Sequence, residues 1–130
     1  MPTRAKLTTK GLEKYLEALA QAGRDVDAAA ARAVQAGADV ALDGMKKRVP
    51  RDTGNLERNL EVATGRDGNM HWGEIGLLKG VDADTARYGN VQEFGSSTMT
   101  AQPYIRPTMA EDKGKIRAAM RESLEQDGVI

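Results

Sequence analysis

The sequence predicts an α+β fold with two N-terminal helices, a small antiparallel sheet of three to four strands, a short helix and a C-terminal helix. Three observations predict it. A long alanine-rich stretch from about Val26 to Arg48 repeats its apolar residues at helical spacing. Apolar and polar residues then alternate between Leu56 and Leu78, as in half-buried strands. From Pro107 onward, apolar residues again recur at helical spacing, with charges on the opposite face.

The helical half of the chain is expected to follow a flexible arm at residues 1–8. Thr8 or Thr9 can cap a first helix that ends at Gly23, and Asp25 can cap the second, long helix. The inward stripe of this second helix consists mostly of small side chains. Such a stripe allows close approach to a helix, to a sheet or to another subunit, and the sequence leaves these three possibilities open.

The second half of the chain is expected to alternate strands with helices. A half-buried strand over residues 56–63, which can begin with a helical turn, and a hairpin connection at residues 65–69 lead to a return strand at residues 70–78. A short helix follows at residues 84–94. The rigid, extended run at residues 102–107 is expected to be a third strand, and its final proline suits the first turn of the last helix.

The composition indicates one domain, residues 1–130, with no net charge. Its 19 basic and 19 acidic residues cancel, which argues against autonomous binding to nucleic acid. The absence of cysteine excludes a disulfide framework and a thiolate metal site. No signal-peptide core or membrane-spanning run is found, so we expect the protein to be made and used in a cytoplasm. The single histidine, His71, is expected on the surface of a strand, and no cofactor or metal is expected.

The stretch from Val49 to Leu56 joins the helical half to the sheet. A proline at its start disfavours helical geometry in the preceding residue, so the long helix should end there. Turn-forming residues follow, including a glycine that tolerates positive φ, and a leucine then returns to the core. We interpret this stretch as a structural corner formed by Pro50, Asp52, Thr53, Gly54, Asn55 and Leu56.

The corner also contains Asp52-Thr53-Gly54, a catalytic motif in aspartic proteases. A small homodimeric protease could use one such aspartate per chain, with the two carboxylates sharing a proton. That chemistry needs the aspartate on a tight loop between apolar strands, whereas Pro50-Arg51 and a long helix precede it here. The protease is therefore a remote alternative, and no catalytic residue is assigned.

Three segments taken together resemble a known protein family. They are Lys47–Leu56, Tyr88 with Glu93-Phe94-Gly95, and Met99–Pro107. In this order and spacing they are similar to the tail-component family of long, non-contractile-tailed bacteriophages and prophages. Two positions depart from the family pattern: Arg51 replaces a small apolar residue, and Gly89-Asn90 interrupts the short helix.

The resemblance implies a virion structural protein of the tail-completion type, with no catalysis and no cofactor. Such proteins form a homo-oligomeric ring, commonly a hexamer, at the head-proximal end of the tail. The ring joins the tail tube to the connector and stopper proteins of the head and leaves a channel through which DNA passes. The expected location is the virion, at the head–tail junction or in the tail, after assembly in the host cytoplasm. Another minor tail or head–tail joining role is the alternative.

The small, polar segment Gly95–Ala101 is expected to be a mobile loop that orders on assembly, although an ordinary surface loop is the alternative. The resemblance assigns its two anchors to the residues that flank it. The hypothesis for the assembly interface therefore comprises Glu93, Phe94, Gly95, Ser96, Ser97, Thr98, Met99, Thr100, Ala101, Gln102, Pro103, Tyr104, Arg106 and Pro107.

Overall fold

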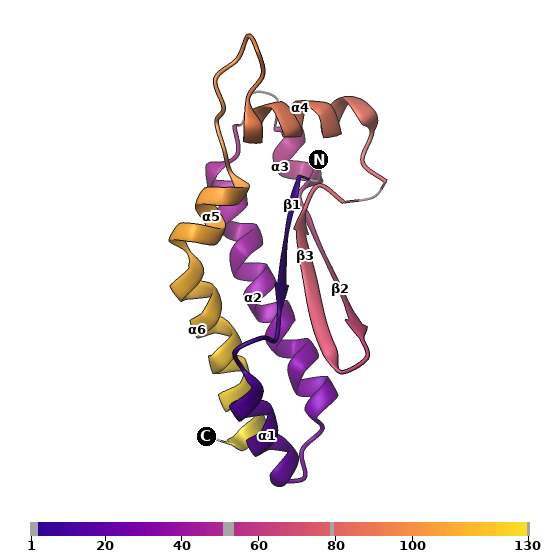
Figure 1. Ribbon diagram of the computed structural model, residues 1–130, viewed down its shortest axis with the longest axis vertical. Coiled ribbons are helices and arrows are strands. Elements are labelled where there is room, and N and C mark those ends of the chain that lie inside the picture. The colour runs from indigo at the N-terminus through magenta and orange to yellow at the C-terminus, as the bar shows by residue number, and fades with distance from the viewer. Residues whose placement is uncertain (1–2, 51–53, 79, 130) are drawn as a thin grey trace.

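The computed structural model describes residues 3–50, 54–78 and 80–129, and these residues form the predicted α+β fold. A three-stranded antiparallel sheet packs on the long helix, and the C-terminal helices lie alongside that helix (Figure 1). The elements in chain order are β1 (Arg4–Thr8), α1 (Glu13–Gln21), α2 (Val26–Arg48), α3 (Asn55–Asn59), β2 (Glu61–Asp67), β3 (Met70–Gly76), α4 (Ala83–Phe94), α5 (Ile105–Glu111), α6 (Lys113–Leu124) and the π-helical turn η1 (Glu125–Val129).

The sheet has the strand order β1-β3-β2, so that β3 is central. Strands β2 and β3 form the predicted hairpin, with Asp67 opposite Met70 beside the turn. The flexible arm expected at residues 1–8 is wrong for Arg4–Thr8, which form an edge strand antiparallel to β3. Polar and apolar residues do alternate in this segment, but five residues give only a weak pattern, and the pairing partner β3 lies far away in the chain.

Helix α2 is the centre of the core, between the sheet and α6. A Cβ built on Gly73 of β3 would lie 3.0 Å from Val34 Cγ1, and one built on Gly37 would lie 2.6 Å from Met120 Cγ. The small residues of α2 and its partners therefore allow close approach on two sides at once. Within the chain, the small-residue stripe packs against both a sheet and a helix.

Two segments at the expected strands are helical. Asn55–Asn59 form α3, which is the helical turn that could begin the strand expected from residue 56, so β2 begins only at Glu61. The third strand expected at residues 102–107 is wrong, because α5 begins at Ile105. Pro107 lies in the first turn of α5, where its missing N–H removes no helical hydrogen bond.

The molecule is elongated, and α4 lies across one end of it (Figure 1). The connection from α4 to α5 projects beyond this end, while α1 and the C-terminal turn lie at the opposite end. The predicted C-terminal helix is divided into α5 and α6 at Asp112. This division lets α5 approach α4 while α6 follows α2 along its length.

Candidate functional site

The structure describes the corner between α2 and β2 except for residues 51–53. Val49 leaves helical geometry with φ −66° and ψ 137°, so α2 ends directly before Pro50, as predicted. Gly54 has a φ of +76°, the left-handed conformation that a residue without Cβ adopts at little cost. The predicted corner residues Asp52 and Thr53 lie outside the described residues.

The corner is fastened to the start of α4 by side-chain hydrogen bonds. Asn55 Nδ2 donates to Thr85 Oγ1 at 2.7 Å, and Thr85 donates through Oγ1 at 2.7 Å and through its backbone N at 3.0 Å to the carboxylate of Asp82. These bonds from Thr85 lower the pKa of Asp82. Leu56 is 1% exposed, and a Cβ on Gly89 would lie 3.1 Å from its Cδ2. The corner and α4 thus form one packed unit.

Glu93, in the last turn of α4, is the centre of the second predicted segment. Its Oε1 accepts hydrogen bonds from the backbone N–H groups of Tyr104 and Ile105, each at 2.8 Å, and its Oε2 accepts from the backbone N–H of Arg106 at 3.0 Å. These N–H groups belong to the start of α5, where no helical carbonyl can accept them. One carboxylate therefore caps α5 and joins it to α4. We call this arrangement the Glu93 clamp.

Arg106 completes the Glu93 clamp from the solvent side. Its Nε donates to Glu93 Oε2 at 2.9 Å, and its Nη2 donates to the Glu93 carbonyl oxygen, which lies at the unsatisfied end of α4. The side chain of Glu93 is 1% exposed, whereas that of Arg106 is 58% exposed. The guanidinium also lies 5.1 Å from the centre of the Phe94 ring, within the range of a cation–π contact.

The environment of Glu93 keeps its carboxylate charged despite burial. Burial by itself raises the pKa of Glu93, but the N–H groups of Ile105, Tyr104 and Arg106, with the Arg106 guanidinium, lower it further than burial raises it. The net result is a pKa below the ordinary value. Burial and the charge of Glu93 raise the pKa of the Tyr104 hydroxyl, which stays protonated and donates to the Gly89 carbonyl at 3.2 Å.

The glycine that interrupts the predicted short helix has a packing reason. Helix α4 is continuous from Ala83 to Phe94, through Gly89 and Asn90. A Cβ on Gly89 would collide with Leu77 Cδ1 and would lie 3.0 Å from the Tyr104 hydroxyl oxygen. The departure from the family pattern therefore makes room for Tyr104 and Leu77 against α4 without breaking the helix.

The loop between α4 and α5 closes on itself at its base and at its tip. Gln102 N donates to the Gln92 carbonyl at 2.7 Å, and Ser96 and Met99 exchange backbone hydrogen bonds of 2.8 and 3.4 Å. Gly95 begins the loop with a φ of +78°, and a Cβ there would lie 3.0 Å from Ala101 N. Beyond this base the loop projects from the molecule, and the Met99 side chain is 38% exposed (Figure 1).

The basic residues at the C-terminal end of α2 have partners inside the chain. Arg48 Nη1 donates to Asp112 Oδ2 at 2.8 Å and Nη2 to Glu111 Oε2 at 2.9 Å, so Arg48 joins α2 to the α5–α6 junction. Lys47 pairs with Asp43 one turn earlier at 2.9 Å. Arg48 holds the pKa of Asp112 below its usual value. These ion pairs account for Lys47 and Arg48 without a phosphate ligand.

His71 is not on the strand surface as expected but is 7% exposed, on the side of β3 that faces α2. Its Nε2 lies 3.3 Å from Asp27 Oδ1, which explains how the imidazole is accommodated. Within the described part of the chain, no cluster of three or more possible metal ligands is found. No described helix has both the length and the apolar character needed to cross a membrane.

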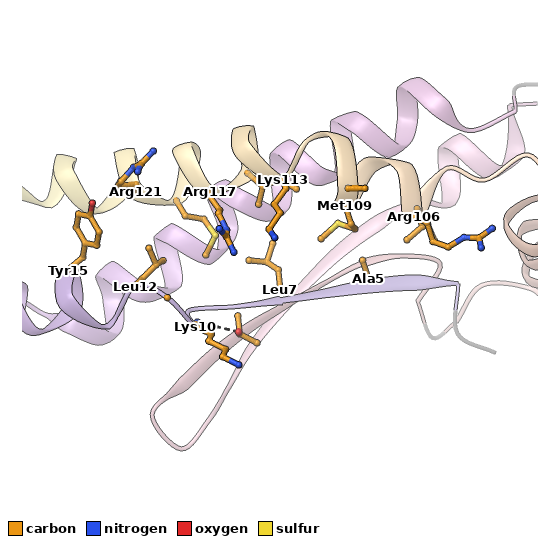
Figure 2. Close-up of a pocket in the computed structure, with 16 residues that line it drawn as sticks. Ala5, Leu7, Lys10, Leu12, Tyr15, Arg106, Met109, Lys113, Arg117 and Arg121 are labelled. Carbon is orange, nitrogen blue, oxygen red and sulfur yellow. Dashed lines mark hydrogen bonds between the residues drawn. The ribbon is translucent and has the colours of Figure 1, made fainter.

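A cavity of about 900 Å³ lies between β1 and the α5–α6 pair (Figure 2). Its floor is apolar and includes Leu7, Leu12, Met109 and Met120. Five basic residues line it as well: Lys10, Arg106, Lys113, Arg117 and Arg121. No local sequence pattern reveals this groove, because its walls come from opposite ends of the chain.

The corner, the Glu93 clamp and the loop lie at the three sequence segments on which the family resemblance rests. A comparison with models of protein families tests that resemblance directly. Residues 10–95 match the family described as "Bacteriophage HK97-gp10, putative tail-component". The chain belongs to this family. The match covers α1 through α4 and ends at Gly95, the first residue of the projecting loop. Neither the proteins of curated function nor the solved structures contain a match.

Membership gives this HK97-gp10-like protein a structural role in the bacteriophage tail, and therefore a place in the virion. Among the described residues, the hydrogen bonds that the Glu93 carboxylate accepts come from backbone N–H groups and from Arg106, so the Glu93 clamp joins α4 to α5. One signal in the sequence could have revealed the clamp. A glutamate in the last turn of a helix is disfavoured by the helix dipole, so its presence there indicates a specific partner.

Proposed function

We infer that this HK97-gp10-like protein is a tail-completion subunit. Copies of it form a ring, commonly a hexamer in proteins of this type, at the head-proximal end of the tail. The ring joins the tail tube to the connector and stopper of the head and leaves a central channel for DNA. Family membership supports a tail role, and the projecting loop supports a role in joining.

The observation that carries the proposal is a projecting loop on a rigid base. The base is fixed by the buried Glu93 carboxylate and by the hydrogen bond between Gln102 and Gln92. Ser97 and Thr98 lie at the polar tip. Met99 is 38% exposed although its sulfur contacts Gln92 beneath the loop, and Phe94 is 36% exposed beside the base. A polar loop flanked by partly exposed apolar side chains is suited to insertion between neighbouring subunits, since its base holds it in a defined direction.

The contacts under the loop leave room for rearrangement on assembly. Gln92 is 1% exposed, and within the described part of the chain its amide nitrogen donates to the Met99 sulfur, at the long distance of 3.9 Å. Among the described residues, its Oε1 has no hydrogen-bond partner, and neither has the buried Oδ1 of Asn90. A buried acceptor without a partner costs about 1–3 kcal/mol. Contacts with a neighbouring subunit that supplied donors here would stabilise the assembled state over the free one.

The proposal assigns no catalysis to the chain, and Asp52 tests that part. Asp52→Asn removes the carboxylate that the protease alternative requires while preserving side-chain size. We expect phage carrying this variant to assemble normal particles with unchanged processing of virion proteins on a denaturing gel. Loss of a proteolytic product in this variant would instead establish the protease.

The decisive experiment is electron microscopy of particles made without this protein. We expect DNA-filled heads alongside separate, full-length tails, because the proposed role is confined to joining the two. Joined particles of normal appearance would refute the proposal. Tails of altered length, or no tails at all, would favour the alternative of another minor tail protein.

A deletion tests the loop separately from the rest of the chain. Gly95 and Ala101 are neighbours at its base, so removal of residues 96–100 can be closed with little change around the Glu93 clamp. We expect the deletion variant to melt like the unmodified protein but to fail in restoring head–tail joining. A replacement of residues 96–100 by an equally long Gly-Ser segment is the matched control for length. Restoration of joining by the deletion variant would rule out the loop as the assembly element.

A further inference from the structure

The groove between β1 and the α5–α6 pair combines an apolar floor with basic walls. Leu12, Tyr15 and Met109 are half-buried there, so apolar surface remains open to the groove. In Figure 2, the side chains of Lys113 and Arg117 point from α6 toward β1, across the apolar floor. A concave surface of this kind, partly apolar and bordered by charges of one sign, has the character of a binding site for a protein segment.

The charges of the groove have no counterpart within it. None of the described residues that line it is acidic. Of its five basic residues, only Arg106 takes part in an ion pair, with Glu93, among the pairs found in the described part of the chain. Lys10 interacts electrostatically with the carboxylate of Glu13. Lys113, Arg117 and Arg121 are therefore three neighbouring cations of α6 whose repulsion an anionic partner would relieve.

Three carboxylates near the groove bind arginine residues of α2. Glu111 and Asp112 bind Arg48 on the α2 side, and Asp127 binds Arg32 of α2. Glu13, close to the end of the groove, accepts a hydrogen bond from the backbone N–H of Gly11. Because the chain has no net charge, the basic groove reflects a separation of charges over the surface and not a generally basic protein.

We propose that this groove binds an amphipathic helix of a partner protein, with its apolar stripe on the groove floor and its Asp or Glu residues beside Lys113, Arg117 and Arg121. The three cations follow one another at four-residue intervals along α6, which places them about 6 Å apart along the helix axis. Carboxylates at four-residue intervals on a partner helix repeat at the same distance. Nucleic acid would match the charge but would leave the apolar floor without a partner.

The inference rests on the proposed function only in taking the partner to be a protein of the virion. The groove is separate from the tip of the projecting loop, and its binding is measured on the isolated full chain. The peptide can therefore fail to bind the groove while the loop deletion abolishes head–tail joining. Equally, the peptide can bind while the loop deletion leaves joining intact.

The test uses a fluorescently labelled helical peptide of about 18 residues, long enough to span the roughly 12 Å between the first and last cation of α6. Its sequence places Leu on one face and Glu at four-residue intervals beside that face. Two matched peptides replace all Glu by Lys, or all Leu by Ser. Anisotropy is measured with the unmodified chain, with K113E/R117E, and with K14E/K115E, a double reversal of two exposed lysines that do not line the groove.

We expect the Leu/Glu peptide to bind, and K113E/R117E to weaken that binding by about tenfold or more, whereas K14E/K115E leaves it within about twofold. Binding should also weaken as salt is raised. Melting curves of both variants should match that of the unmodified chain, since the reversed side chains are exposed.

Four results would overturn the proposal. Equal binding of the Leu/Glu and Ser/Glu peptides would show a purely electrostatic surface, as would tighter binding of a DNA duplex than of the peptide. No binding of the Leu/Glu peptide at low salt would exclude the site. A concentration-dependent dimer in light scattering that disappears in K113E/R117E would identify a second copy of the chain as the occupant instead.

Discussion

Glu93 and Arg106 are joined three times, twice through the Glu93 carboxylate and once through its backbone carbonyl oxygen. The two residues are expected to contribute differently to the stability of the fold. Glu93 is buried and also accepts the N–H groups of Tyr104 and Ile105, whereas Arg106 is largely exposed. A buried acceptor serving several buried donors is costly to remove, while an exposed cation on a carboxylate contributes little by itself.

Glu93→Ala should therefore lower the free energy of unfolding by about 3 kcal/mol, because it leaves buried N–H groups of α5 without an acceptor. Glu93→Gln should cost less, since an amide oxygen can still accept some of these bonds. Arg106→Ala should cost about 1 kcal/mol or less. Urea unfolding measures all three, and a larger loss for Arg106→Ala than for Glu93→Ala would contradict this ranking.

The Glu93 clamp also predicts that the free energy of unfolding depends on pH in the acidic range. The folded-state pKa of Glu93 is lower than its ordinary value of 4.5, so the folded protein favours the charged form more than the unfolded chain does. Its contribution is therefore fully present above about pH 4.5 and is lost as pH falls through the folded-state pKa. In Glu93→Gln, unfolding free energy measured between neutral pH and acid should fall less steeply. An unchanged slope would show that Glu93 does not titrate differently on folding.

Two glycines in neighbouring helices should respond oppositely to alanine. At Gly44 of α2, a Cβ would collide with the carboxylate of Asp112 and lie 2.8 Å from Thr108 Cγ2, so Gly44→Ala should destabilise by about 1–3 kcal/mol. At Gly114 of α6, nothing lies within 4 Å of the added atom, and Gly114→Ala should stabilise by about 0.5–1 kcal/mol. Thermal melting of the two variants gives the comparison. Equal effects would mean that α2 does not approach the α5–α6 junction as closely as described.

The corner glycine tests backbone conformation separately from packing. Gly54 has positive φ, which a β-branched side chain resists and asparagine tolerates. Gly54→Val should therefore lower the unfolding free energy by about 1–2 kcal/mol or more, and Gly54→Asn by clearly less. A chemical denaturation series decides this, and equal losses would point to a different conformation at the corner.

Much of this protein could be predicted from local patterns. The helix from Asp25 to Arg48 follows from its cap and its periodicity, and its end follows from Pro50. The positive φ of Gly54 follows from turn chemistry. The predictions that failed concern short segments whose structure depends on distant partners. Arg4–Thr8 alternate polar and apolar residues, but so short a strand forms only where β3 offers it an edge.

The sequence by itself determined the α+β class, the corner after α2 and the family, because these depend on periodicity, proline and glycine geometry and the order of short motifs. Only the tertiary structure decided the rest. Residues 102–104 were expected to pair as a strand, but the Glu93 carboxylate accepts the N–H groups at the start of α5, and the chain turns into a helix there. The groove likewise exists only where β1 meets α5 and α6. Hydrogen bonds and packing between distant segments leave no signature in the local sequence. They can therefore be recognised only in the folded structure.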